Sequence, residues 1–314
     1  MVTIIPWPPE MSMLADLEAH RQLVMEWLGT HRTQEWDLLL ARQQQLRVAL
    51  AHSLEPPRFM AFTDLAGAYD IGLPLELLER YQIRVVGGAV RDRLLGVSQS
   101  PDIDCVVPAE FWQDFLDHVD ACGYRPRISA HALACKLQQG PATGREFVAT
   151  RSDSYLPGGR LKQAAPAPLA SDPWRRDFTI QALYADPRSG ELWDPFAAAA
   201  QPCLRAVMPG TLTEDPLRVV RLVRAHVTHG LQIDEPTKLE AQAVASSELA
   251  LWVESHRVRA ELDRAARCGV LGGLLRTLAR WHWPRIVEPD PSHDRLTARS
   301  ATQWLRRAGL PAYA

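Results

Sequence analysis

The sequence is poor in lysine and has almost no net charge, and both features limit how the protein can bind a polyanion such as nucleic acid. Its 314 residues carry a formal charge of −2, and the lysines are confined to Lys136, Lys162 and Lys238. A charge this small gives no overall attraction to nucleic acid, so any such binding must depend on local arginine clusters. Arginine suits bidentate phosphate contacts, although a GC-rich genome produces the same bias without functional meaning.

The sequence also lacks the marks of disulfide-rich, zinc-binding and membrane proteins. Its five cysteines are scattered and form no CxxC pair, which argues against a disulfide framework and a zinc knuckle. No apolar run reaches the roughly 18 residues of a membrane helix, and the initial MVTIIPWPPEM does not resemble a signal peptide. We therefore expect a cytoplasmic protein with no membrane partner, whose oligomeric state stays open.

Helical and strand-like patterns occupy different parts of the chain. Apolar residues recur at helical spacing in MLADLEAHRQLVMEWL and EWDLLLARQQQLRVALAHSL, and again in most segments after Thr211. Short runs rich in β-branched residues, IRVVGG, DIDCVV, LACKLQQ and REFVATR, predict strands, and EFWQDFLDHVDACG between them predicts a helix. The stretch 152–171 is rich in Pro, Gly and Ala and predicts a loop that could move.

This order of elements predicts an α+β fold in three parts. A small mixed-sheet head domain is expected over residues 81–205. A helical N-terminal extension would precede it over residues 1–80, and a helical neck with a short body would follow over residues 206–314.

Chemistry-bearing residues first appear in VVGGAVRDRLLG, residues 85–96, and in the PDIDCVV that follows. A strand that ends in Gly87 and Gly88 before a helix lets backbone N–H groups approach a phosphate. Asp102 and Asp104 alternate with Ile103 on the next strand, so their carboxylates project from one face, where they can share hard cations. Taken separately, these features also fit a tight turn and a solvated strand end. Together they favour two Mg²⁺ ions and phosphoryl chemistry.

GGAVRDRLLG with DID resembles the signature of the class II tRNA nucleotidyltransferases (CCA-adding enzymes) and bacterial poly(A) polymerases, within the polymerase β superfamily. DPWRRDFTIQAL resembles the RRDFTINAL motif of this family, ELWDPF resembles the approach to its neck, and TEDPLRVVRLVRA resembles its EDxxR element. The likeness spans about residues 83–265, with the motifs in the family's order.

The resemblance implies a role for each matching residue. Asp102 and Asp104 would hold two Mg²⁺ ions and carry catalysis, with CTP or ATP as substrate and the 3′ end of tRNA or a similar RNA as partner. The other implied residues would bind the nucleotide: the triphosphate at Gly87, Gly88 and Arg91, the ribose at Asp177 with Arg176 nearby, the base at Asp215 and Arg218, and a phosphate at Arg221. Glu146 would be a third catalytic carboxylate or a surface partner of Arg145.

The sequence departs from the family pattern at several positions. Gln181 stands where the motif has asparagine, and Leu133–Ala134 replaces the Gly-Thr of the central hairpin. The glycine pair expected after DPF is replaced by AAAAQP at 197–202, which we expect to stiffen a hinge-like segment.

Several functions remain open from the sequence. The expected activity is template-independent addition of C, A or both to an RNA 3′ end. A poly(A) polymerase, or an enzyme that adds CC or A alone, fits the same motifs. A catalytically impaired nucleotide- or RNA-binding protein is an alternative of another class, although both aspartates, RRD and EDxxR are present. Transfer to a protein or small-molecule hydroxyl is a further alternative, which the base-reading EDxxR disfavours.

Overall fold

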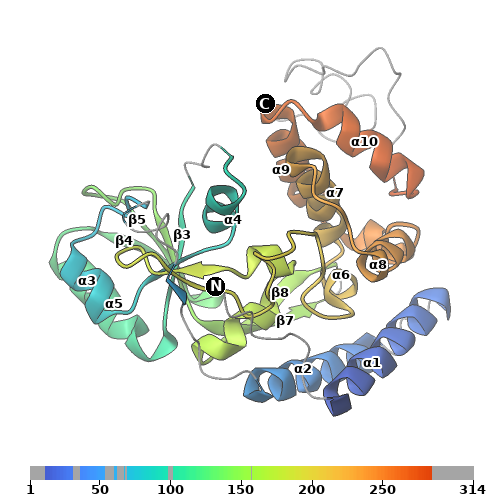
Figure 1. Ribbon diagram of the computed structural model, residues 1–314, viewed down its shortest axis with the longest axis horizontal. Coiled ribbons are helices and arrows are strands. Elements are labelled where there is room, and N and C mark those ends of the chain that lie inside the picture. The colour runs from blue at the N-terminus through green and yellow to red at the C-terminus, as the bar shows by residue number, and fades with distance from the viewer. Residues whose placement is uncertain are drawn as a thin grey trace. The chain divides into compact units, whose positions relative to one another are not determined.

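A computed structural model gives the structure of residues 11–30, 36–53, 60–61, 67, 69–97, 102–156 and 158–284 (Figure 1). The chain forms two compact units. The first unit contains Met1–Leu14, Gln44–Ser154 and Leu161–Pro202, and the second contains Ala15–Gln43, Tyr155–Arg160 and Cys203–Ala314. The three-part division expected from the sequence stays a prediction.

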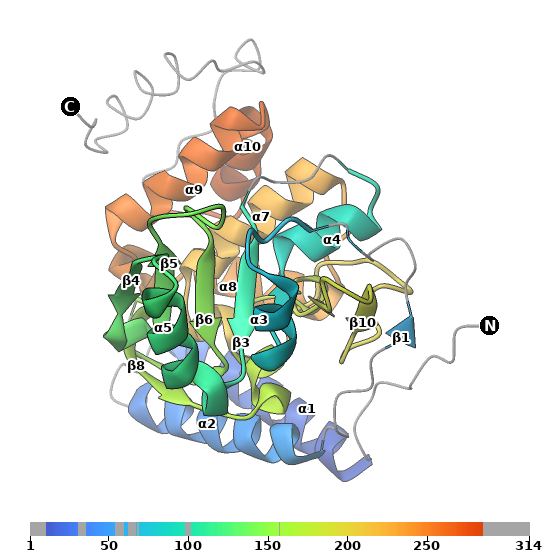
Figure 2. The same ribbon diagram turned by 90° about the vertical axis from the view of Figure 1, so that its left-hand side faces the viewer.

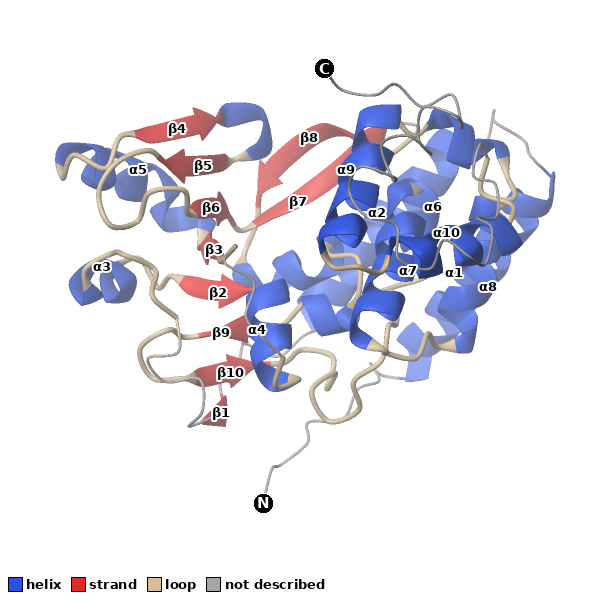
Figure 3. Ribbon diagram, turned by 90° about the horizontal axis from the view of Figure 1, so that it is seen from above, coloured by secondary structure: helices blue, strands red, loops and turns tan. Residues whose placement is uncertain are grey.

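An eight-stranded mixed sheet forms the centre of the first unit, with strand order β1-β10-β9-β2-β3-β6-β5-β4 (Figure 3). The strands β3 and β6 are parallel, and the other neighbouring strands are antiparallel. The predicted α+β class and mixed sheet are therefore confirmed. The strands are β1 (Met60–Ala61), β2 (Arg84–Val86), β3 (Asp104–Val107), β4 (Pro126–Ser129), β5 (Ala134–Leu137), β6 (Glu146–Ala149), β9 (Tyr184–Ala185) and β10 (Glu191–Trp193).

The segment predicted as a loop over 152–171 is instead largely a β-hairpin, so that prediction is wrong. Its strands are β7 (Arg151–Leu156) and β8 (Arg160–Pro166). Gly158 and Gly159 both have positive φ, at 81° and 77°, which allows the tight turn between the strands. Glycine and proline are typical of loops, but here the glycines lie in the turn and Pro166 is the last residue of the second strand, so they are compatible with a hairpin.

Helices and 3-10 turns cover the sheet of the first unit. In Figure 2, α3 and α5 lie in front of β3 and β6. Phe115 of α5 packs against Phe147 of β6 with ring centroids 5.2 Å apart, and both side chains are buried. The predicted helix in EFWQDFLDHVDACG is confirmed as α5. The bounds are α3 (Leu75–Arg80), α4 (Gly88–Leu94), η3 (Ala109–Phe111), α5 (Trp112–Ala121), η4 (Ala130–Ala132), η5 (Leu169–Arg175) and η6 (Thr179–Gln181).

The second unit is helical, as the pattern after Thr211 predicts. Its core is built from apolar stripes such as that of α10, which buries Leu271, Leu274, Leu275 and Leu278. In the described part of the chain, no helix is both long and apolar enough to cross a membrane. The remaining helices are α1 (Met11–Thr30), α2 (Trp36–Ser53), α6 (Thr211–Glu214), α7 (Leu217–His229), α8 (Glu235–Ala245), η7 (Glu248–Trp252), α9 (Ser255–Arg267) and α10 (Leu271–Arg280).

Candidate active site

Three carboxylates lie at one end of the parallel strand pair β3–β6. Asp104 begins β3 and is the direct neighbour of Glu146, which begins β6. Asp102 lies two residues before Asp104, and the intervening Ile103 is buried while both aspartates are exposed. Paired residues of adjacent strands project from the same face, so Asp104 and Glu146 share a face.

Glu146 lies close to the negative charges of both aspartates. The pKa of Glu146 is raised from its usual value, first by burial and then by the charges of Asp104 and Asp102, while Lys136 and Arg151 oppose the shift. A divalent cation would relieve this repulsion, and carboxylate oxygens are ligands that Mg²⁺ accepts. Among the described residues, no three His, Cys, Asp or Glu side chains are grouped closely enough to hold a metal by themselves. Phosphate and water oxygens would therefore have to complete the coordination of an ion at this site.

A glycine turn lies between β2 and α4, beside the RRD segment. Gly87 has φ 79° and ψ −130°, a conformation that residues with a Cβ rarely adopt. A Cβ on Gly87 would lie 4.0 Å from Nη1 of Arg176 and 4.0 Å from Oε1 of Gln181. The structure thus brings three predicted features together within the first unit: the Gly87–Gly88 turn, Arg176 and the Gln181 that replaces asparagine.

Arg91 lies at this turn, but its guanidinium has a protein partner. A Cβ on Gly88 would lie 3.6 Å from Nη2 of Arg91. Nε of Arg91 donates a hydrogen bond of 2.8 Å to Asp92, and both side chains are buried. A phosphate at this turn would therefore meet Arg91 as part of a buried ion pair.

Asp172 is a central polar residue of the RRD segment that the sequence motifs did not single out. Its carboxylate accepts hydrogen bonds from Arg175 at 2.7 Å, from Arg176 at 2.7 Å and from the Tyr184 hydroxyl at 2.6 Å. Burial disfavours the charged form, but Arg175 and Arg176 prevail and hold the pKa of Asp172 well below its usual range. The guanidinium of Arg176 also lies over the Tyr184 ring, 5.5 Å from its centroid. Asp172 therefore fixes the orientation of Arg176.

Asp177 follows Arg176 and is buried in the same unit. Its Oδ1 accepts a hydrogen bond of 3.0 Å from the backbone N–H of Phe178. This contact holds the side chain close to its own backbone.

The residues expected to read the base belong to the second unit, where Asp215 is buried under the hairpin turn. Both oxygens of Asp215 accept from Nη2 of Arg257, at 2.9 and 3.2 Å. Nη1 of Arg257 also donates to the carbonyl of Gly158. A Cβ on Gly159 would fall only 1.9 Å from Oδ1 of Asp215, so the turn covers this carboxylate and glycine is required there. Burial raises the pKa of Asp215, and Arg218 and Arg257 oppose that shift.

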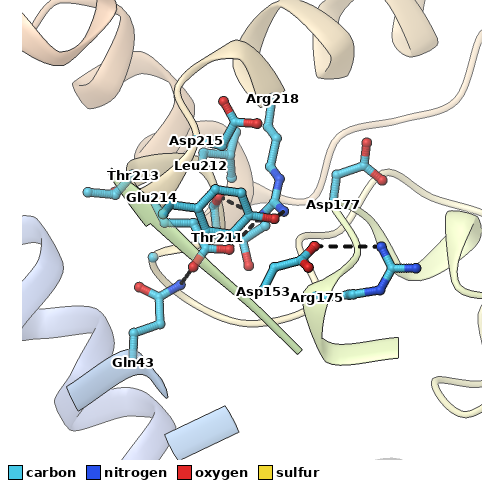
Figure 4. Close-up of polar contacts among 12 residues, drawn as sticks. Gln43, Asp153, Arg175, Asp177, Thr211, Leu212, Thr213, Glu214, Asp215 and Arg218 are labelled. Carbon is cyan, nitrogen blue, oxygen red and sulfur yellow. Dashed lines mark hydrogen bonds and ion pairs between the residues drawn. The ribbon is translucent and has the colours of Figure 1, made fainter. Parts of the chain in front are cut away.

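Arg218 and Arg221 form ion pairs with carboxylates other than that of Asp215. Nη1 of Arg218 donates to Glu214 at 2.7 Å and to the carbonyl of Thr211, and its Nη2 donates to the Tyr155 hydroxyl at 3.1 Å. Figure 4 shows Glu214 and Arg218 with their neighbours. Arg221 lies 3.6 Å from Glu261 of α9. The structure therefore places Asp215 and Arg218 in one unit, with separate ion-pair partners.

Glu240 of α8 is a further residue that sequence reasoning missed. It is buried, and its carboxylate accepts from the backbone N–H groups of Gly210, Leu212 and Thr213 at 3.0–3.1 Å. These donors belong to the start of α6, which leads directly into Asp215. No motif marks Glu240, because its partners lie about 30 residues earlier in the chain.

Two departures from the family pattern keep the backbone shape that glycine favours. Leu133 has φ 45° and Ala197 has φ 52°, both in the left-handed region. The carboxylate of Asp194 stabilises the turn that contains Ala197, because it accepts hydrogen bonds from the backbone N–H groups of Phe196, Ala198 and Ala199. Asp194 thus caps a turn that carries backbone strain at Ala197, and the stiffening expected for residues 197–202 stays a prediction.

Comparison with known proteins identifies the head segment. Residues 83–201 match the family model of the poly A polymerase head domain. A CCA-adding enzyme of Pseudomonas putida is 38% identical over 196 residues, which cover 59% of this chain and 50% of that protein. A multifunctional CCA protein of Stenotrophomonas maltophilia is 36% identical over 227 residues, covering 67% of this chain and 52% of that protein. The chain spans 50% to 62% of the length of these relatives and of a second Pseudomonas putida CCA-adding enzyme.

Solved structures share the fold. A CCA-adding enzyme in its apo form II aligns with a TM-score of 0.62 at 19% identity, covering 81% of this chain and 64% of that one. A tRNA nucleotidyltransferase complexed with a primer tRNA and an incoming ATP analog aligns with a TM-score of 0.55 at 21% identity, covering 74% of this chain and 69% of that one. The expected resemblance to the tRNA nucleotidyltransferases and bacterial poly(A) polymerases is confirmed by the match of residues 83–201 to the poly A polymerase head domain and by the similarity to CCA-adding enzymes.

Proposed function

We propose that the chain is a template-independent RNA nucleotidyltransferase that adds C, A or both to the 3′ end of tRNA or a tRNA-like RNA. The observation that carries the proposal is the placement of Asp104 directly beside Glu146, with Asp102 two residues away, in the unit that also holds the Gly87–Gly88 turn. In this proposal residues 81–205 are the catalytic head, residues 206–314 the neck and short body, and residues 1–80 a helical extension. Such an enzyme would act where tRNA is processed, in the cytoplasm.

The carboxylates would bind Mg²⁺, and their chemistry supports this. Asp102 and Asp104 are the proposed ligands, and Glu146 is the proposed third carboxylate because it is paired with Asp104 on the neighbouring strand. Bound there, two Mg²⁺ ions would activate the attacking hydroxyl and neutralise the departing pyrophosphate. In the reaction the RNA 3′-oxygen forms a bond to the α-phosphorus of the nucleotide. The bond from that phosphorus to the bridging oxygen of the β-phosphate breaks, and pyrophosphate leaves.

The nucleotide would be held by the residues that the family motifs mark. Gly87 and Gly88 would let the backbone approach the triphosphate, with Arg91 and Arg176 as nearby cations and Asp177 at the ribose. Asp215 and Arg218 would pair with the base edge, and Arg221 would contact a phosphate. An acceptor-only carboxylate and a donor-only guanidinium can complement the mixed edges of cytosine and adenine. CTP and ATP are therefore the proposed substrates.

The test is incorporation of labelled CTP and ATP into tRNA that lacks its terminal CCA, with Mg²⁺ present and the products separated on a gel. Addition of up to three nucleotides supports the CCA type, and a long adenosine ladder supports a poly(A) polymerase. Extension that stops after CC, or that uses ATP alone, identifies an enzyme of narrower specificity. Nucleotide binding with no pyrophosphate release would replace the proposal with a binding function.

A further inference from the structure

The buried face of α2 contains a glutamine at a position where helical spacing calls for an apolar residue. Trp36, Leu39 and Leu50 lie on this face with exposed fractions of 3% or less, and Gln43 is 1% exposed. A buried amide is costly unless it is hydrogen-bonded, so this glutamine is expected to have a specific partner.

The partner of Gln43 is Glu214, the first residue of the EDxxR element that is proposed to read the base. Nε2 of Gln43 donates a hydrogen bond of 3.0 Å to Oε2 of Glu214, drawn as a dashed line in Figure 4. The other oxygen of that carboxylate, Oε1, accepts from Nη1 of Arg218 at 2.7 Å. Glu214 is 2% exposed, so neither bond is shared with bulk water. The amide and the guanidinium thus hold the carboxylate from its two sides.

The backbone is shaped to let α2 come this close. Gly210 precedes α6 with φ 83°, and a Cβ there would lie 2.3 Å from Oε1 of Gln43. An aromatic chain holds the start of α2 in the same unit. Trp36 packs against Trp27 at 5.2 Å and against Trp252 at 6.0 Å, measured between ring centroids. The glutamine therefore has little freedom to leave Glu214.

We propose that Gln43 is a positioning residue for nucleotide selection, which brings the N-terminal extension into the base-reading device. It fixes the rotation of the Glu214 carboxylate and, through it, the guanidinium of Arg218. This inference rests on the proposed function, in which Arg218 reads the base. Without Gln43 the buried carboxylate turns toward other donors, and the donor fork of Arg218 loses its fixed direction.

The experiment compares Gln43→Leu, which removes the amide at nearly constant volume, with Gln45→Leu on the exposed face of the same helix. The readout is the ratio of kcat/KM values for CTP against UTP, and for ATP against GTP, on tRNA lacking CCA. We expect the ratio to fall about tenfold in Gln43→Leu and to stay unchanged in Gln45→Leu, with parental thermal unfolding in the control. A purely structural role would lower activity with every nucleotide alike and leave the ratios unchanged.

A double-mutant cycle identifies the route of the effect. If Gln43 acts through Glu214, adding Gln43→Leu to Glu214→Gln changes the selection ratio by less than about twofold beyond Glu214→Gln alone. Should Gln43→Leu fail to fold, Gln43→Asn carries the same test, because its shorter amide does not reach Glu214.

The outcomes separate this inference from the proposed function. Parental selectivity in the folded Gln43 variant, or additive effects in the cycle, overturns the positioning role while the enzyme activity stands. A parent protein that incorporates no nucleotide overturns the proposed function and the positioning role together.

Discussion

Ala197 offers a test of backbone strain whose sign is set by the structure. Its φ of 52° lies in the left-handed region, where a Cβ costs about 1–2 kcal/mol relative to glycine. Glycine in turn gives the unfolded chain more freedom, which costs about 0.4–1 kcal/mol. We therefore expect Ala197→Gly to raise the free energy of unfolding by about 0.8 kcal/mol, the difference between the midpoints of the two ranges.

The adjacent alanine is a matched control with the opposite expected sign. Ala198 is 3% exposed, and its φ is not in the left-handed region. Ala198→Gly loses a buried methyl group and gains unfolded-state freedom, so the free energy of unfolding should fall by about 1 kcal/mol or more. Urea denaturation followed by tryptophan fluorescence measures both midpoints at comparable slope. A loss of stability in Ala197→Gly as large as that in Ala198→Gly would refute the strain argument.

Three further predictions concern the site itself. Glu146→Gln should raise the Mg²⁺ concentration needed for half-maximal incorporation by about tenfold with little change in thermal stability, and a Mg²⁺ titration that matches the parent would remove Glu146 from the metal site. Asp172→Asn should lower the free energy of unfolding by about 3–5 kcal/mol at neutral pH, because the largely buried Arg175 and Arg176 lose the buried anion that they share. The pKa of Asp172 is depressed in the folded state, so its carboxylate stabilises the fold above the unfolded value of 3.8. This stabilisation is lost as the pH falls from 3.8 through the folded-state pKa. The difference in unfolding free energy between parent and variant should therefore shrink in acid. Gly159→Ala should lower the free energy of unfolding by about 2 kcal/mol or more, because the φ of Gly159 is 77° and the new Cβ would clash with Asp215. An unchanged midpoint in thermal or urea unfolding would show that the turn does not contact that carboxylate closely.

Local patterns predict much of this fold because its strands and main helices carry their own signals. The runs IRVVGG and DIDCVV became β2 and β3, and EFWQDFLDHVDACG became α5, since apolar period and glycine stops act within a few residues. The hairpin β7–β8 was not predicted, because the glycines of its turn and the alanines of its second strand resemble the sequence of a loop.

The proposed catalytic carboxylates could be located from the sequence, but the residues that support the candidate site could not. Asp102 and Asp104 are visible as an alternating pair within one strand segment. The bond from Gln43 to Glu214 joins residues 171 positions apart, and only tertiary packing reveals it. Glu240 and Asp172 likewise act through partners that no local spacing specifies. Motifs therefore locate the expected chemistry, and the folded chain shows which other residues hold it in place.

The most direct test of the central claim is Mg²⁺-dependent incorporation of labelled CTP or ATP into tRNA lacking CCA, measured for the parent protein and for Asp102→Ala and Asp104→Asn. Extended RNA and released pyrophosphate are expected with the parent, and a loss of incorporation on the order of a hundredfold or more is expected in each variant with folding preserved. Incorporation by the two variants at the parental rate would contradict the central claim, as would a folded parent that extends no RNA.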